Sequence, residues 1–157
     1  MDKRKDSENL LEIEKALDRE NVTDTTNTDE DTFPDIFISY SRSDWKSHVK
    51  PLGQMLFDSG FNVWIDQHII RSGDDWLDKI NEALDKCKVL ILCVSSSALN
   101  SRYVKMEYRY FLDEDKPVIP VIIEETKLTA ELRGIQHIQY GENDDLIDEI
   151  QRRLNNQ

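Results

Sequence analysis

From Pro34 onward, the chain alternates between short apolar runs and longer stretches in which apolar residues recur every three or four positions. The runs predict β-strands and the longer stretches predict amphipathic helices. Strand and helix repeated in turn are typical of a parallel sheet with helices on both faces. The expected strands are 35–40, 61–66, 88–95, 117–123 and a short fifth strand around 137–140.

The helical stretches carry one apolar stripe each, as expected of helices that pack on a sheet. The first begins after Ser43, the second follows Asp74 and Asp75, the third spans 102–112, and the fourth lies near the end of the chain. We therefore predict a flavodoxin-like α/β fold, a doubly wound five-stranded parallel sheet. The expected core-facing residues of three of these helices are Trp45, Val49, Leu52 and Leu56; Trp76, Ile80, Leu84 and Cys87; and Leu146, Ile147, Ile150 and Leu154.

Two prolines interrupt the pattern. Pro51 lies inside the first helical stripe, where a missing N–H predicts a kink or a late start of the helix. Pro120 lies inside the fourth strand and removes one donor from the sheet. The sequence gives no account of a proline in such a central strand.

Residues 1–33 differ from the rest of the chain. The stretch 7–20 places Leu10, Ile13 and Leu17 on one side of a helix, and 21–33 is a polar, acidic tract without periodicity. We predict a short amphipathic helix plus a flexible acidic linker over 1–33, followed by one domain over 34–157. Two apolar turns are equally consistent with a frayed leader and with an oligomerisation helix.

Composition narrows the class of function. The net charge is −12, and residues 1–33, with 11 acidic and 5 basic side chains, carry half of it. Nucleic-acid binding needs clustered Lys and Arg, so it is disfavoured. The longest apolar run, 89–94, is far shorter than a membrane helix, which predicts a soluble, cytoplasmic protein. Cys87 and Cys93 lack the spacing of a zinc site, so we expect reduced core thiols and no metal.

Candidate chemistry should lie beyond the carboxyl ends of the strands, where open α/β sheets bind ligands. The five glycines form neither a dinucleotide fingerprint nor a phosphate-binding loop, which disfavours a Rossmann dehydrogenase or a P-loop ATPase. After the first strand, 39–43 offers three serine hydroxyls and the Arg42 guanidinium. This segment is either a cradle for phosphate oxygens or a solvated turn that caps the first helix.

The third helix places one carboxylate unusually. At about 100° per residue, Arg102, Lys105 and Arg109 form a polar stripe, and Glu107 lies roughly opposite to it. Tyr103 lies one turn before Glu107 on the helix. Because ionised groups avoid apolar faces unless they are paired, Glu107 is a functional carboxylate or one half of a buried ion pair with an Arg, or the helix is rotated so that Glu107 is exposed to water.

Four separated segments resemble the Toll/interleukin-1 receptor (TIR) domain, in the order and spacing of that family. Residues 34–40 (PDIFISY) are similar to its first box and 61–66 (FNVWID) to its second strand. Residues 70–76 (IRSGDDW) resemble the BB loop of bacterial members. Residues 90–97 followed by 101–107 (SRYVKME) resemble its third strand and its Trp-x-x-x-Glu segment, with Tyr103 in place of the Trp. The third box of animal receptors is not recognisable, which favours the prokaryotic type.

The resemblance implies an enzyme that cleaves NAD⁺ as its substrate and needs no cofactor. By resemblance, Glu107 is the catalytic residue, and a role in bacterial immune defence or signalling is expected. We assign Glu107 to the ribose hydroxyls and to the positive charge that develops when nicotinamide leaves. The candidate substrate-binding residues are Tyr103 and Trp76 as flat surfaces, Asp66 for ribose, Gly73 in the BB loop, and Arg42, Ser39 and Tyr40 for the pyrophosphate.

The resemblance also implies self-association through the BB loop, from Asp66 to Trp76, and head-to-tail contacts of this kind tend to form filaments. A competing hypothesis is a non-catalytic TIR module that transmits signals by stacking. Tyr103 and Ser72, which stands where many members have Pro, favour the module, whereas Glu107 favours the enzyme. A nucleotide carrier of flavodoxin type is a third alternative.

Overall fold

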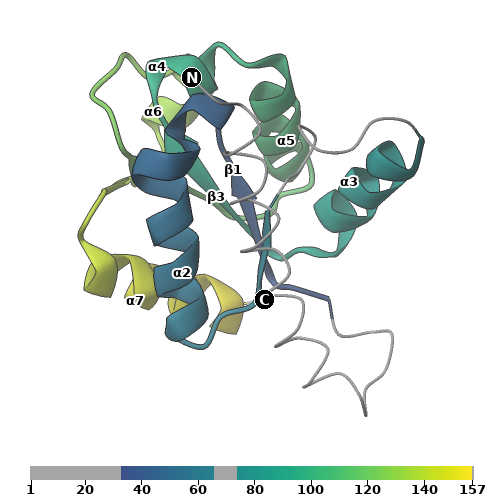
Figure 1. The fold of residues 1–157 in the computed structure, drawn as a ribbon, viewed down its shortest axis with the longest axis horizontal. Coiled ribbons are helices and arrows are strands. Elements are labelled where there is room, and N and C mark those ends of the chain that lie inside the picture. The colour runs from purple at the N-terminus through teal and green to yellow at the C-terminus, as the bar shows by residue number, and fades with distance from the viewer. Residues whose placement is uncertain (1–32, 66–73, 157) are drawn as a thin grey trace.

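The computed structural model describes residues 33–65 and 74–156, with the backbone alone at 74–77. Its core is a five-stranded parallel sheet in the order β2-β1-β3-β4-β5, which confirms the predicted doubly wound fold (Figure 1). The strands are β1 (Ile36–Ser39), β2 (Val63–Ile65), β3 (Val89–Val94), β4 (Val118–Ile122) and β5 (Ile138–Gln139). The helices are η1 (Arg42–Asp44), η2 (Trp45–Val49), α2 (Lys50–Asp58), α3 (Asp74–Lys86), α4 (Ser96–Leu99), α5 (Arg102–Asp113), α6 (Ala130–Arg133) and α7 (Asn143–Asn155).

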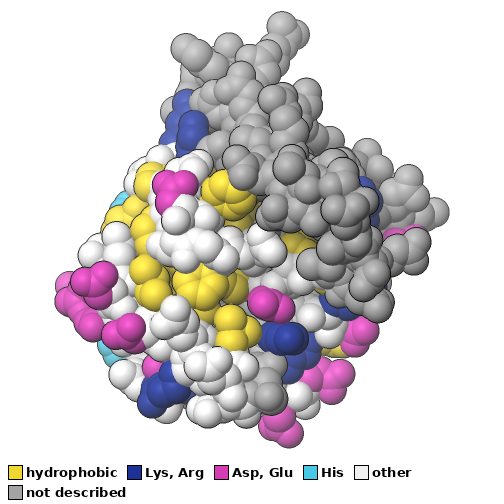
Figure 2. Space-filling view, turned by 90° about the horizontal axis from the view of Figure 1, so that it is seen from below, with side chains coloured by type: hydrophobic (Ala, Val, Ile, Leu, Met, Phe, Trp, Pro, Cys, Tyr) yellow, Lys and Arg dark blue, Asp and Glu magenta, His cyan; other side chains and the backbone are white. Residues whose placement is uncertain are grey.

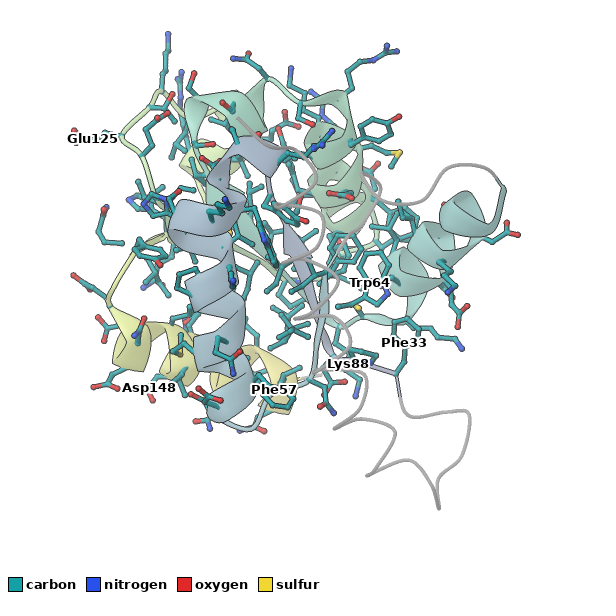
Figure 3. The ribbon with its side chains drawn as sticks, in the orientation of Figure 1. Phe33, Phe57, Trp64, Lys88, Glu125 and Asp148 are labelled. Carbon is teal, nitrogen blue, oxygen red and sulfur yellow. The ribbon has the colours of Figure 1, made fainter. Side chains whose placement is uncertain are left out.

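Helices cover both faces of the sheet, so the apolar residues form two separate clusters. Every residue of β1 and β3 is buried, and alternate side chains point to opposite faces. Ile36 and Ile38 pack toward α2 and α7, whereas Phe37 packs toward α3 and α5. Trp64 stacks on Phe37 with the ring centroids 4.9 Å apart, on the α3 side of the sheet (Figure 3). The near-continuous apolar composition of the third strand follows from this two-sided burial.

The helical stripes predicted from the sequence are confirmed wherever their side chains are described. The buried members are Trp45, Val49, Leu52, Leu56, Ile80, Leu84, Cys87, Leu146 and Ile150, and Ile147 and Leu154 are half-buried. Cys87 and Cys93 are free and buried, as expected of core thiols. Burial raises the pKa of both thiols, which keeps them protonated and unreactive.

Pro51 marks a late start of the first α-helix, as predicted. The chain enters through the π-helical turn η2, in which the N–H of Lys50 bonds to the carbonyl of Trp45, five residues back. Pro51 then occupies the second position of α2, where an N–H would have no partner inside the helix. The proline thus separates the wide first turn from the regular helix that follows.

Pro120 is accommodated by the direction in which its nitrogen points. Residues of a parallel strand bond alternately to the strand on either side. Ile123 donates its N–H to the carbonyl of Val94 in β3, so the odd-numbered residues of β4 face β3. Pro120 therefore turns its nitrogen toward β5, and pairing with β5 begins only at Val121. The missing N–H falls just ahead of that short strand, so a proline is tolerated there.

Lys116 fixes the end of α3 to the turn between α5 and β4. Its ammonium group donates to the carbonyl oxygens of Leu84, Asp85 and Cys87 at 2.7, 2.9 and 2.9 Å. It also lies 4.7 Å from the ring centroid of Phe111. A cation at this place satisfies the last carbonyls of the helix and offsets its dipole.

The predicted helix and linker over 1–33 fall almost entirely outside the described residues. Within 33–65 and 74–156, no helix is long and apolar enough to cross a membrane. Figure 2 views the lower end of the molecule in Figure 1, where apolar side chains are visible among charged ones. Phe57 and Asp148 belong to this lower end, whereas Glu125, in the loop after β4, lies at the upper end (Figure 3).

Replacing Lys116 by Met should lower the free energy of unfolding by about 2 to 3 kcal/mol, because three carbonyl oxygens lose a charged donor. The matched control is Lys86→Met, which removes an exposed ion pair of 3.3 Å to Glu82 and a cation–π contact of 5.6 Å to the ring of Phe33. That change should cost no more than about 0.5 kcal/mol. Urea unfolding followed by circular dichroism compares the two, and equal losses would contradict the role given to Lys116.

Candidate functional site

The site is centred on a hydrogen bond between the first strand and the fifth helix. Ser39 is the last residue of β1, and its hydroxyl donates to Oε1 of Glu107 at 2.7 Å. Glu107 lies in the middle of α5, and both side chains are buried, with exposed fractions of 0% and 1%. A carboxylate so far removed from water needs donors close by, because desolvation otherwise disfavours its charged form. The bond thus stabilises and orients an acidic group at the carboxyl end of the sheet.

Local sequence explains why α5 presents Glu107 to the sheet. Ser101 precedes the helix in an extended conformation, and its hydroxyl accepts a bond from the N–H of Val104 at 3.3 Å. This N-cap fixes where the helix begins. The buried residues of α5 are Val104, Glu107, Tyr108 and Phe111. The expectation that Glu107 lies on the apolar face of its helix is confirmed.

Tyr103 does not share the burial of that face, since 45% of its surface is exposed. On a helical projection, Tyr103 lies about 40° to one side of Glu107 and Val104 about 60° to the other. The helix packs through the Val104 side, which leaves Tyr103 at the margin. Met106, one turn further along that margin, is 44% exposed. An aromatic surface is therefore accessible close to the carboxylate rather than packed over it.

The segment after β1 forms a compact loop. Tyr40 is buried in the core against Trp45, with the ring centroids 5.6 Å apart. Arg42 and Ser43 are exposed, and the hydroxyls of Ser41 and Ser43 are 3.1 Å apart. Of the residues proposed for the pyrophosphate, Arg42 is thus exposed, whereas Ser39 bonds to Glu107 and Tyr40 packs internally.

The remaining predicted contacts belong to the BB loop. Asp66 and Gly73 lie outside the described residues, and Trp76 is described by its backbone alone, in the first turn of α3. Their proximity to Glu107 therefore stays a prediction. In the two described segments, no group of three or more His, Cys, Asp or Glu side chains could hold a metal ion.

Two further ties at this end of the sheet were not singled out from the sequence. The hydroxyl of Ser95, just after β3, donates to Oδ2 of Asp44 at 2.5 Å. The N–H of Ser96 donates to Oε1 of Glu124, just after β4, at 2.7 Å. The sequence signal for these two hydrogen bonds was a serine or an acidic residue soon after a strand. This signal predicts a partner only when the order of the strands in the sheet is known.

On its outer side, α5 is joined to α6. The Arg109 guanidinium donates to both carboxylate oxygens of Glu131, at 3.2 and 3.3 Å, and the Tyr108 hydroxyl lies 3.5 Å from one of them. The hydrogen bond to Glu131 raises the pKa of Arg109. This pair is largely exposed and stabilises the helix little. The buried Ser39–Glu107 contact fixes the inner side of α5 more strongly.

The sequence of this chain is similar to those of known proteins. The chain matches the TIR domain family over residues 36–154. It is 30% identical over 88 residues to the 2′ cyclic ADP-D-ribose synthase AbTIR of Acinetobacter baumannii, covering 55% of this chain and 33% of that protein. It is 27% identical over 103 residues to the NAD(+) hydrolase TcpC of Escherichia coli, covering 62% of this chain and 34% of that protein. The chain spans about a third of the length of these curated relatives.

Solved structures agree on the fold. The TIR domain of the Toll-related receptor TRR-2 from Hydra magnipapillata superposes with a TM-score of 0.64 at 15% identity, covering 76% of this chain and 99% of that chain. The CMP N-glycosidase BcmB of Clostridium botulinum gives 0.54 at 16% identity, covering 74% and 96%. At these identities the comparison shows the fold alone. Because the sequence match extends over 36–154 and the fold agrees with it, this chain belongs to the TIR domain family.

Proposed function

We propose that this domain cleaves the bond between nicotinamide and ribose in NAD⁺, with Glu107 as the catalytic residue. The observation that carries the proposal is the Glu107 carboxylate, buried to 1% exposure at the carboxyl end of the sheet and hydrogen-bonded to Ser39. Relatives named as an NAD(+) hydrolase and a 2′ cyclic ADP-D-ribose synthase support the same substrate.

The reaction needs little acid catalysis. The bond between the ribose anomeric carbon and the pyridinium nitrogen breaks, and its electron pair neutralises the ring, so nicotinamide leaves uncharged. The positive charge moves to the ribose, in an oxocarbenium-like transition state. A carboxylate held beside this position stabilises the transition state more than the substrate, which is the requirement for catalysis. Water then gives ADP-ribose and a proton, and a nucleophile of the same nucleotide gives a cyclic product.

Other residues are assigned to binding. The exposed ring of Tyr103 offers a flat surface for nicotinamide or adenine. Arg42 supplies a guanidinium for the pyrophosphate. Asp66 and Gly73, between β2 and α3, and Trp76, in the first turn of α3, are proposed to complete the site. Since Glu107 is almost fully buried, substrate binding requires a local opening over the middle of α5, at the carboxyl end of the sheet.

The second candidate is a signalling module without catalysis. Tyr103 in place of the family's Trp and Ser72 in place of the Pro of many members favour it. Incubating concentrated protein with NAD⁺ and separating nicotinamide by chromatography discriminates between the two candidates. In either role we propose a cytoplasmic protein of bacterial immune defence or signalling that self-associates through residues 66–76.

Replacing Glu107 by Gln should abolish nicotinamide release, a loss of at least about a hundredfold, because an amide of equal volume does not stabilise a cation. The fold should survive, since the amide oxygen still accepts a bond from Ser39. Liquid chromatography of the products measures the loss, and circular dichroism checks the fold. Turnover unchanged in this variant would remove Glu107 from the mechanism.

Replacing Ser39 by Ala should lower kcat about tenfold, the effect of roughly 1.4 kcal/mol on the barrier. KM should change little, because Ser39 acts on Glu107 rather than on NAD⁺. Stability should fall by about 1 to 3 kcal/mol, since a buried carboxylate loses a donor. Ser47→Ala, which removes an exposed hydroxyl bonded to His48, is the control and should change neither kcat nor stability. A rise in KM at constant kcat would contradict this assignment.

Specific activity should rise with protein concentration, because we propose that a neighbouring copy's 66–76 segment completes the site. Repulsion at net charge −12 opposes this assembly, so higher salt or removal of residues 1–33 should promote it. If Leu10, Ile13 and Leu17 join chains instead, the truncation should weaken assembly. Light scattering and assays across a dilution series measure both effects. Constant specific activity down to the monomer would exclude a shared site.

A further inference from the structure

The loop between β1 and η2 is closed at its base by an aromatic pair. Tyr40 and Trp45 flank its four residues, and their rings pack 5.6 Å apart at an interplanar angle of 38°. Both side chains are buried, with exposed fractions of 2% and 3%. Inside the loop, the N–H of Asp44 donates to the carbonyl of Ser41 at 2.9 Å. The two ends of the loop are therefore fixed in the core.

A third contact ties the loop sideways to the neighbouring strand. Oδ2 of Asp44 accepts the Ser95 hydroxyl at 2.5 Å across 51 residues of sequence. The Ser95 side chain is 1% exposed, and its oxygen also accepts the N–H of Ala98 at 3.0 Å as the N-cap of α4. Because Ser95 is fixed in this way, Asp44 is held against a rigid point at the end of β3. The tie defines where the outer part of the loop can lie.

That outer part presents donors suited to phosphate. The hydroxyls of Ser41 and Ser43 are 3.1 Å apart and share one hydrogen bond, so one hydroxyl hydrogen remains to donate elsewhere. The exposed Arg42 guanidinium lies between them in the sequence. Arginine and hydroxyl donors together match the oxygens of a phosphate group. Such a contact is sensitive to position, because a hydrogen bond weakens steeply when its angle is poor.

We propose that Asp44 and Ser95 are positioning residues that hold this loop for the pyrophosphate of the dinucleotide. The inference rests on the proposed function and deepens it, since it assigns phosphate recognition to a loop that is anchored apart from the catalytic carboxylate. Glu107 is held by α5 and Ser39, whereas the loop is held by β3 through Ser95. Loss of the tie should therefore weaken binding of phosphate-bearing ligands and leave the chemical step intact.

The test compares Asp44→Ala and Ser95→Ala, alone and combined, in the full chain. Each should raise KM for NAD⁺ about tenfold, the effect of one charge-assisted hydrogen bond, with kcat within about twofold of the parent. The double variant should be no worse than Ser95→Ala, because that substitution already removes the bond that Asp44→Ala breaks. Asp44→Ala also removes a negative charge near the phosphates, which alone would lower KM. A rise in both variants therefore isolates the tie.

Three controls sharpen the test. Ser95→Thr keeps the hydroxyl and should restore the parent KM. Glu124→Gln removes a carboxylate at the same end of the sheet that bonds to Ser96 and not to the loop, and it should leave KM unchanged. Inhibition by nicotinamide, which has no phosphate, should be the same in all variants, whereas inhibition by ADP-ribose should weaken in step with KM.

Three results would overturn the proposal. They are additive effects of the two substitutions on KM, a loss of inhibition by nicotinamide as large as the loss of inhibition by ADP-ribose, and a fall in kcat at constant KM. Calorimetric binding of ADP-ribose separates its failure from that of the proposed function. A parent protein that binds ADP-ribose without cleaving NAD⁺ contradicts the catalytic proposal, and the dissociation constants of the variants then decide the role of the tie. A parent protein that neither cleaves NAD⁺ nor binds ADP-ribose contradicts both.

Discussion

The hydrogen bond from Ser39 to Glu107 is the contact on which the arrangement at the carboxyl end of the sheet depends. It joins the last residue of the first strand to the middle of the fifth helix, in a place that water does not reach. A carboxylate there is costly without a donor. The position of α5 along and around its axis is therefore constrained, because a rotation by one residue would place Met106 or Tyr108 against the end of β1. Catalytic chemistry at Glu107 would depend on the same constraint.

The parallel sheet supplies the rest of the arrangement. Carboxyl ends of neighbouring parallel strands meet at one edge, so segments far apart in the sequence become adjacent there. Among the described residues, three ties between serines and carboxylates bridge this edge: Ser39 to Glu107, Ser95 to Asp44, and the Ser96 N–H to Glu124. The first orients an acid, and the second fixes a loop with exposed donors. In the proposed function, the catalytic acid and the phosphate-binding loop are therefore held by separate contacts at one edge of the sheet.

Much of the fold could be predicted from periodicity, because burial on two faces produces regular apolar patterns. The runs at the first and third strands, the helical stripes and the late start at Pro51 all follow from local chemistry. Pro120 could not be explained, because its tolerance depends on the short pairing of β5, which lies farther along the chain. The inward side of Glu107 was also predictable, since it follows from about 100° of rotation per residue.

The exposure of Tyr103 was less accessible to sequence reasoning. An apolar residue at the margin of a stripe can fall on either side of the buried arc, and packing against the sheet decides which. Hydrogen-bond partners were hidden for a related reason. Ser39 and Glu107 are 68 residues apart, and Asp44 and Ser95 are 51 apart, so their pairing requires the strand order. Periodicity predicts which way a side chain points but not which residue it contacts.

The central claim is that NAD⁺ reacts at the Glu107 carboxylate. A crystal or cryo-electron microscopy structure with a non-cleavable carbocyclic analogue of NAD⁺ tests it most directly. The account predicts that the carbocycle in place of the nicotinamide ribose lies within hydrogen-bond distance of Glu107, and that the pyrophosphate lies beside Arg42. An analogue bound elsewhere, with Glu107 still buried against Ser39, would contradict it.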